Sequence, residues 1–132
     1  MAAARVLICD DEAHILHVLS AKLRNNGFEV FSAADGEEGL ELARRHHPDL
    51  IITDYQMPFL SGLELCARLR AEAALSSIPV IMLTARGFSL EAKDLADTNI
   101  RQVLTKPFSP REVLQTVRNL IGGGVPAAAA AE

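Results

Sequence analysis

The sequence lacks the residues and segments on which several common protein classes depend. Its 132 residues include no tryptophan, one tyrosine and two cysteines. Cys9 and Cys66 cannot form a disulfide framework and do not have metal-ligand spacing, so we expect buried, reduced thiols and a cytoplasmic location. No apolar run approaches the ~20 residues of a membrane span. The segment Met1–Arg5 leads directly into a strand-like run without the apolar core of a signal peptide.

The sequence also has fewer basic than acidic residues. The 13 Lys and Arg residues against 17 Asp and Glu residues give a formal net charge of −4, so we expect no direct contact with nucleic acid and no membrane partner. With 49% hydrophobic and 23% charged residues, the composition is that of a soluble globular protein of one domain. We expect that domain over residues 1–121, followed by a flexible Gly/Ala-rich tail or linker root over residues 122–132.

Five short apolar runs alternate with five segments of helical periodicity. The expected strands are residues 6–9, 28–33, 50–54, 78–84 and 103–105. The expected helices lie between and after them, the third over 63–72, the fourth over about 89–96, and the last ending at Gly122. This alternation predicts the α/β class, with a parallel sheet covered by helices on both faces, right-handed crossovers and a single switch point.

A few residues predict where helices begin and end. Gly27 offers a left-handed cap to the first helix, and Asp35 has the side chain of an N-cap for the second. Ser109, with Pro110 at the first helical position and Glu112 three residues after the cap, predicts a capping box at the last helix.

The chain around Asp54 is the most informative stretch. The apolar run Leu50–Ile52 is typical of a strand buried on both faces, and it ends in Thr53-Asp54. Open α/β folds keep their chemistry at the carboxyl edge of the sheet, where Asp54 would stand. Taken alone, Asp54 is also compatible with an ordinary loop start, because aspartate is common in turns.

Charged or polar residues end four of the five expected strands. They are Asp10 and Asp11 after the first strand, Asp54 at the third, Thr84 at the fourth and Lys106 at the fifth. The ends of parallel strands share one edge, so we expect these side chains to line a common crevice. Three carboxylates against one lysine favour a divalent cation, and Mg²⁺ suits carboxylates completed by water and phosphoryl oxygens. A carboxylate there can accept a phosphoryl group as an acyl phosphate, with Thr84 as a hydroxyl donor and Ala85 leaving the approach open.

Taken together, these segments resemble the receiver domain of the two-component response-regulator family. The matching pieces are Asp10-Asp11, Thr53-Asp54 with Met57-Pro58 and Gly62, Leu83-Thr84-Ala85 and Lys106-Pro107-Phe108, and the resemblance covers about residues 5–121. It implies a flavodoxin-like doubly wound (βα)5 sandwich with a five-stranded parallel sheet in the order 2-1-3-4-5. It also implies a signalling switch and not an enzyme in the ordinary sense. Such a domain takes a phosphoryl group from a phospho-histidine and loses it to water in a self-catalysed step.

The resemblance assigns roles to the residues of the expected crevice. Asp54 is the phospho-acceptor, and it ligates Mg²⁺ together with Asp11 and the backbone carbonyl of Gln56. Asp10 holds a metal-bound water.

The resemblance also assigns roles to residues at the ends of the fourth and fifth strands. Thr84 and Lys106 contact the phosphoryl oxygens, and the bond between Lys106 and Pro107 is expected to be cis. The chain departs from the family at Val103, where many receivers carry an aromatic switch residue, so a muted or rerouted structural change is expected. The turn before strand five lacks the usual Gly-Ala, but Asn99 can take a left-handed conformation there at modest cost, so we expect the fold to be intact.

Partners follow from the resemblance as well. A sensor histidine kinase or a histidine phosphotransfer protein would dock on Glu12, Ile15 and Val18. The alternative is a solvated Glu12 with Ile15 in the core. A downstream protein target or effector domain would receive the output, and the chain would be a monomer or a weak dimer.

Other functions remain open at this stage. An aspartyl-phosphate phosphatase of related fold would place Asp-x-Asp on strand one, whereas this chain has adjacent aspartates and no cap insertion. A flavin-binding module needs a phosphate-cradling loop, and Asp10-Asp11-Glu12 would repel a phosphate there. A degenerate receiver that acts as a phosphorylation-independent interaction module is the remaining alternative.

Overall fold

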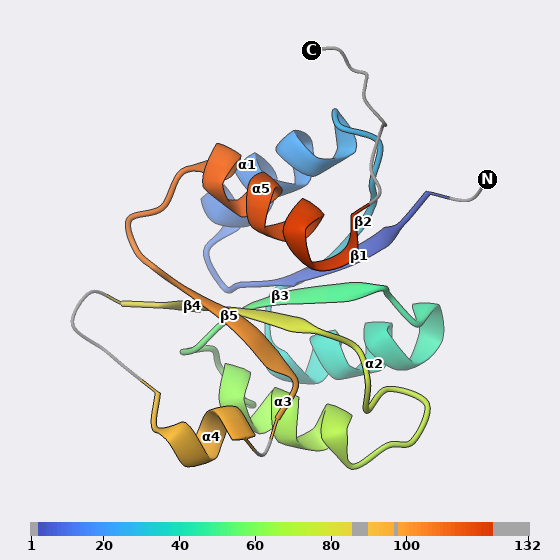
Figure 1. The fold of residues 1–132 in the computed structure, drawn as a ribbon, viewed down its shortest axis with the longest axis vertical. Helices are drawn as coiled ribbons and strands as arrows, with labels where there is room; N and C mark the ends of the chain where they lie inside the picture. The colour runs from blue at the N-terminus through green and yellow to red at the C-terminus, as the bar shows by residue number, and fades with distance from the viewer. Residues whose placement is uncertain (1–2, 86–89, 97, 123–132) are drawn as a thin grey trace.

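A central parallel sheet with helices on both faces forms the fold (Figure 1). The computed structural model describes residues 3–85, 90–96 and 98–122. The elements in chain order are β1 Arg5–Cys9, α1 Ala13–Arg24, β2 Glu29–Ala33, α2 Gly36–His46, β3 Leu50–Asp54, α3 Gly62–Arg70, β4 Val80–Thr84, α4 Ala92–Ala96, β5 Ile100–Thr105 and α5 Pro110–Ile121. The strand order β2-β1-β3-β4-β5 confirms the predicted doubly wound α/β fold.

Two apolar cores lie on opposite faces of the sheet, because successive side chains of a strand point to opposite sides. Leu7, Ile51 and Met82 belong to the core beneath α2 and α3. Ile8 and Ile52 belong to the core beneath α1 and α5. Figure 1 shows α1 and α5 together on one face, with α2, α3 and α4 on the other. The burial of β3 and β4 along their whole length follows from this double cover.

The helix starts bear out some predicted caps and correct others. Asp35 accepts a hydrogen bond from the backbone N–H of Glu38 and caps α2 as predicted. The reciprocal capping box lies at Ser61 and Glu64, where α3 begins one residue before the expected Leu63. The last helix was expected to carry that box. There the described contacts include the bond from the Glu112 backbone to the Ser109 hydroxyl, and no return bond.

The fold is intact at the turn before β5, as expected, although Asn99 does not take the left-handed conformation that was open to it. In the described part of the chain, the non-glycine residues with positive φ are His47 and Phe59. Asn99 instead buries its side chain, accepting a hydrogen bond from Arg70 at 2.7 Å and donating one to the carbonyl of Ser76. The side chain thereby joins the end of α3 to the start of β5, a long-range role that its local sequence does not reveal.

Two expected boundaries also moved. Strand four was expected from residue 78 but begins at Val80, and strand five begins at Ile100, before its expected core. The fourth helix spans Ala92–Ala96, and the expected start at residue 89 lies outside the described residues, as does the expected tail beyond residue 122. Among the described helices, none is long and apolar enough to cross a membrane.

Candidate functional site

The carboxyl edge of the sheet brings three aspartates together. Asp10 directly follows β1 and is held there by two hydrogen bonds: its N–H donates to Ala33 at 3.0 Å, and its Oδ1 accepts from the Glu12 N–H at 2.9 Å. Asp54 is the last residue of β3 and is 7% exposed, whereas Asp11 is exposed. One carboxylate oxygen from each aspartate lies within 4.8 Å of the others.

This oxygen cluster fits a small divalent cation. Its donors are all carboxylate oxygens, which Mg²⁺ prefers. Asp10 is fully buried, yet its Oδ2 has no hydrogen-bond partner among the described residues. A buried carboxylate oxygen without a partner is unfavourable, so the cluster is better satisfied with a cation than without one.

Lys106 reaches the same cluster from the end of β5. Its Nζ lies 3.0 Å from Asp54 Oδ1, and 4.0 Å from both Asp10 Oδ2 and Glu12 Oε1. Its backbone N–H donates to the carbonyl of Thr84 at 2.8 Å, which ties the start of the following loop to β4. The bond to Pro107 is cis, as expected. The sheet thus places one ammonium group against the carboxylates that the sequence pattern brought to this edge.

The pKa values of these groups reflect burial first and charge second. Desolvation raises the pKa of Asp10 from 3.8 to about 6, against the hydrogen bond from Glu12, and repulsion by Asp54 adds to the rise. Desolvation also raises the pKa of Asp54 and outweighs the opposing bond from Lys106. Burial alone would lower the pKa of Lys106, but the bond to Asp54 and the nearby carboxylates raise it. The lysine therefore stays charged while two of the aspartates are poorly stabilised as anions.

A small crevice of about 120 Å³ opens above Asp54. Tyr55, Gln56, Ala85 and Lys106 line it together with Asp54, so Gln56 and Ala85 stand where the sequence placed them. Thr84 is not one of the described residues that line this crevice. Thr84 is fully buried, and its hydroxyl has no hydrogen-bond partner there. Tyr55 is a lining residue that the sequence reading missed, although it directly follows Asp54.

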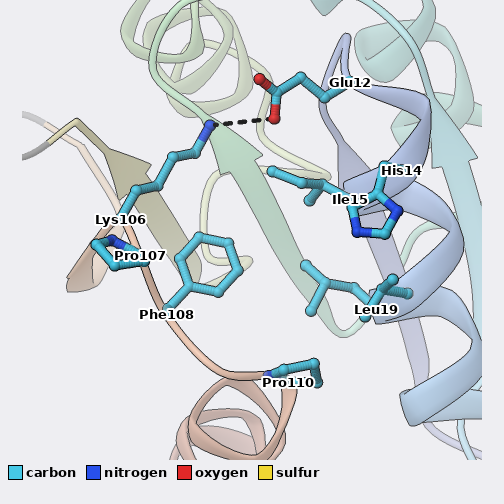
Figure 2. A pocket seen from close by; sticks show the side chains of 9 residues that line it. Glu12, His14, Ile15, Leu19, Lys106, Pro107, Phe108 and Pro110 are labelled. Atoms are coloured by element: carbon cyan, nitrogen blue, oxygen red, sulfur yellow. Dashed lines mark ion pairs between the residues drawn. The ribbon is translucent and has the colours of Figure 1, made fainter.

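A second, larger hollow of about 370 Å³ lies between α1 and the loop that leads into α5. Glu12, Ile15 and Val18 line one side, and the structure adds residues not expected from the sequence: His14, Leu19, Lys106, Pro107, Phe108 and Pro110. Figure 2 shows Glu12, His14, Ile15 and Leu19 across from Lys106, Pro107 and Phe108. Ile15 is only partly buried against the core beneath α1, so it serves both the core and the hollow. We call this hollow the α1–α5 groove.

Val103, in place of the switch aromatic, is partly buried. It packs against the core beneath α2 and α3. The smaller side chain leaves no aromatic ring at this position of β5.

A doubly wound parallel sheet with an acidic cluster and a lysine at its carboxyl edge defines the class of receiver-type signalling domains. The family model "Response regulator receiver domain" matches residues 6–118. The chain belongs to this family, the receiver domains of two-component response regulators.

Individual relatives agree with this assignment. A probable transcriptional regulator ycf27 of Porphyridium aerugineum is 38% identical over 121 residues, which cover 92% of this chain and 49% of the relative. The chain therefore spans about half the length of the curated relatives it matches. The chemotaxis response regulator CheY4 of Vibrio cholerae superposes with a TM-score of 0.83 at 32% identity, covering 91% of this chain and all of that structure (100%).

A further solved structure concerns the metal. The receiver domain of the sensor histidine kinase PA1611 from Pseudomonas aeruginosa PAO1 has a TM-score of 0.81 at 28% identity, covering 92% of this chain and 100% of that one. That structure is described with a magnesium ion coordinated in its active-site cleft.

Proposed function

We propose that this chain accepts a phosphoryl group on Asp54 from a phospho-histidine of a sensor kinase or phosphotransfer protein, in a reaction that requires Mg²⁺. The chain then releases the group to water and so acts as a phosphorylation switch. The observation that carries the proposal is the cluster itself: three carboxylate oxygens within 4.8 Å of one another, with the Lys106 ammonium 3.0 Å from Asp54.

The transfer needs an anionic oxygen and charge stabilisation around it. An oxygen of the Asp54 carboxylate attacks phosphorus, the bond from phosphorus to the donor nitrogen breaks, and its electron pair returns to the imidazole. Lys106 is placed to neutralise charge on the phosphoryl oxygens, and Thr84 is proposed to turn its unpartnered hydroxyl toward them. In the second step, water attacks phosphorus, the bond to the Asp54 oxygen breaks, and the carboxylate and inorganic phosphate are released.

The residues present fit a magnesium ion. Asp11 and Asp54 would ligate it with the backbone carbonyl of Gln56, and Asp10 would hold a bound water. The ion would neutralise charge between the carboxylates and the phosphoryl group. Asp10 has an unpartnered oxygen and a raised pKa, so the ion would offset the cost of its buried negative charge the most.

The α1–α5 groove is proposed as the docking surface for the phosphodonor, because it adjoins the crevice at Lys106, which lines both. A cytoplasmic location, a downstream protein target or effector domain, and a monomer or weak dimer complete the proposal. The domain limits of 1–121 are proposed with it.

Incubation with acetyl phosphate and Mg²⁺, followed by intact mass measurement, tests the function. The wild-type chain is expected to gain one phosphoryl group, and neither Asp54→Asn nor a sample treated with a chelator should gain it. Equal labelling of Asp54→Asn would place the chemistry elsewhere. A wild-type chain that never takes the label would favour a phosphorylation-independent interaction module.

A further inference from the structure

Phe59 is the most exposed of the large apolar side chains described, with 77% of its surface open. It lies in the loop between β3 and α3, shortly after Asp54. A single exposed apolar residue is normal on a protein surface. The conformation of its backbone is not.

The chain is strained at this residue. Phe59 has a φ of +69°, and the Leu60 N–H donates to the Pro58 carbonyl at 2.7 Å. That bond closes a three-residue γ-turn, and a positive φ at its central residue is the rare, strained form. A bulky side chain with positive φ is an outlier, whereas glycine has no Cβ and adopts positive φ readily. The position therefore holds a residue that disfavours its own backbone.

Two glycines allow close contacts within the loop that carries this turn. A Cβ added to Gly36 at the start of α2 would collide with the backbone of Leu60. A Cβ added to Gly62 would collide with the carbonyl of Asp54, and the Gly62 N–H donates to Tyr55 at 2.8 Å. These contacts hold Leu60 against α2 and the end of the loop against β3, and none of them involves the side chain of Phe59. The exposed ring adds little to the fold that would offset the strain.

The position of the loop indicates what the ring contacts. Tyr55 and Gln56, from the same loop, line the crevice above Asp54, which is only 7% exposed. A protein that delivers a phosphoryl group to so recessed a carboxylate must rest on the rim of this crevice. The α1–α5 groove lies on one side of that rim, and the loop of Phe59 leads to the opposite face of the sheet, where Leu60 packs against α2.

We propose that Phe59 is a contact residue for the protein phosphodonor. The ring would bury itself in an apolar recess beside the phospho-histidine, while the α1–α5 groove holds the donor on the other side of Lys106. This inference rests on the proposed function and adds to it a second anchor, in the loop that follows Asp54. A strained backbone that presents an exposed aromatic ring is the arrangement expected where binding, and not stability, has determined the residue.

The test compares Phe59→Asn and Phe59→Leu with Leu95→Asn, which removes the other exposed large apolar side chain, on α4. The donors are the purified, phosphorylated histidine kinase and phosphotransfer domains encoded in the same genome. The one that transfers fastest to the wild-type chain is used for all variants. Acetyl phosphate serves as a donor without a protein surface.

For Phe59→Asn we expect kcat/KM with the protein donor to fall at least about tenfold, mainly through KM, because an aromatic contact is lost. Labelling by acetyl phosphate should stay within about twofold, and the urea midpoint of unfolding should stay close to that of the wild-type chain because the exposed ring contributes little to the fold. Phe59→Leu should keep most of the transfer rate, and Leu95→Asn all of it.

Four results would overturn the inference: unchanged transfer from the protein donor in Phe59→Asn, an equal loss with acetyl phosphate, an equal loss in Leu95→Asn, or the absence of any protein donor for a chain that acetyl phosphate labels. Failure of acetyl phosphate to label the wild-type chain would instead refute the proposed function itself, so the two failures are distinguishable.

Discussion

Replacing Asp10 with asparagine is expected to stabilise the metal-free protein while weakening its response to Mg²⁺. Asp10 is fully buried, and desolvation raises its pKa from 3.8 to about 6. That difference corresponds to about 3 kcal/mol of unfavourable free energy at neutral pH, where the side chain is ionised in both the folded and the unfolded state. The amide removes this penalty, and its oxygen can still accept the bond from Glu12.

Part of the gain is offset. The pKa of about 6 already includes the attraction to Lys106, so the remaining cost is that the new amide N–H₂ takes the place of an oxygen that has no hydrogen-bond partner. This loss is worth about 1–2 kcal/mol, which leaves a net stabilisation of about 1–2 kcal/mol. Because the pKa of Asp10 is higher in the folded state, its contribution to wild-type stability falls as the pH rises from 3.8 to about 6. Asp10→Asn should lack this share of the pH dependence.

Urea unfolding with a chelator, near neutral pH and again near pH 3.8, where folded Asp10 is protonated, measures both effects. Added Mg²⁺ should then raise the stability of the wild-type chain more than that of Asp10→Asn. Asp11→Asn is the matched control: Asp11 is exposed, so its removal should change metal-free stability little while also reducing the response to Mg²⁺. Equal or lower metal-free stability of Asp10→Asn would refute the claim that this buried charge is a liability without a cation.

Three other substitutions test the arrangement around the site. Lys106→Gln removes the cation 3.0 Å from Asp54 and is expected to slow labelling by acetyl phosphate roughly 10- to 100-fold, measured by intact mass against time; an unchanged rate would contradict its role. Gly62→Ala forces a Cβ onto the Asp54 carbonyl and should lower the free energy of unfolding by about 1–3 kcal/mol in urea, so full stability would mean that the loop yields easily. Ser61→Ala removes the α3 cap that pairs with Glu64 and should destabilise by about 1 kcal/mol by the same measurement, with labelling retained; loss of labelling would mean that the cap also sets the site geometry.

The sequence predicted the fold and the grouping of the site well because both depend on simple periodic rules. Strands buried on both faces read as continuous apolar runs, as at Leu50–Ile52, and parallel strands bring their ends to one edge. The grouping of the acidic cluster with Lys106 could therefore be predicted from the positions of these residues at the ends of the strands. The start of β5 was harder to predict, since Arg101 and Gln102 are exposed and interrupt the apolar pattern.

What the sequence could not predict depends on contacts between distant segments. Asn99 is buried by Arg70 and Ser76 instead of adopting a left-handed turn, and no local pattern encodes that choice. The loop that carries the strained turn at Phe59 likewise depends on close contacts of Gly36 with Leu60 and of Gly62 with Asp54. The depth of Asp54 and the raised pKa of Asp10 also require the packed structure, because burial sets both.

Locating the phosphoryl group tests the central claim most directly. After incubation with acetyl phosphate and Mg²⁺, borohydride reduces an acyl phosphate on aspartate to the alcohol of homoserine, and peptide mass mapping then identifies the modified residue. Asp54 is expected to be the one position converted. Conversion of a different carboxylate, or a label that resists reduction because it sits on histidine or serine, would contradict the account.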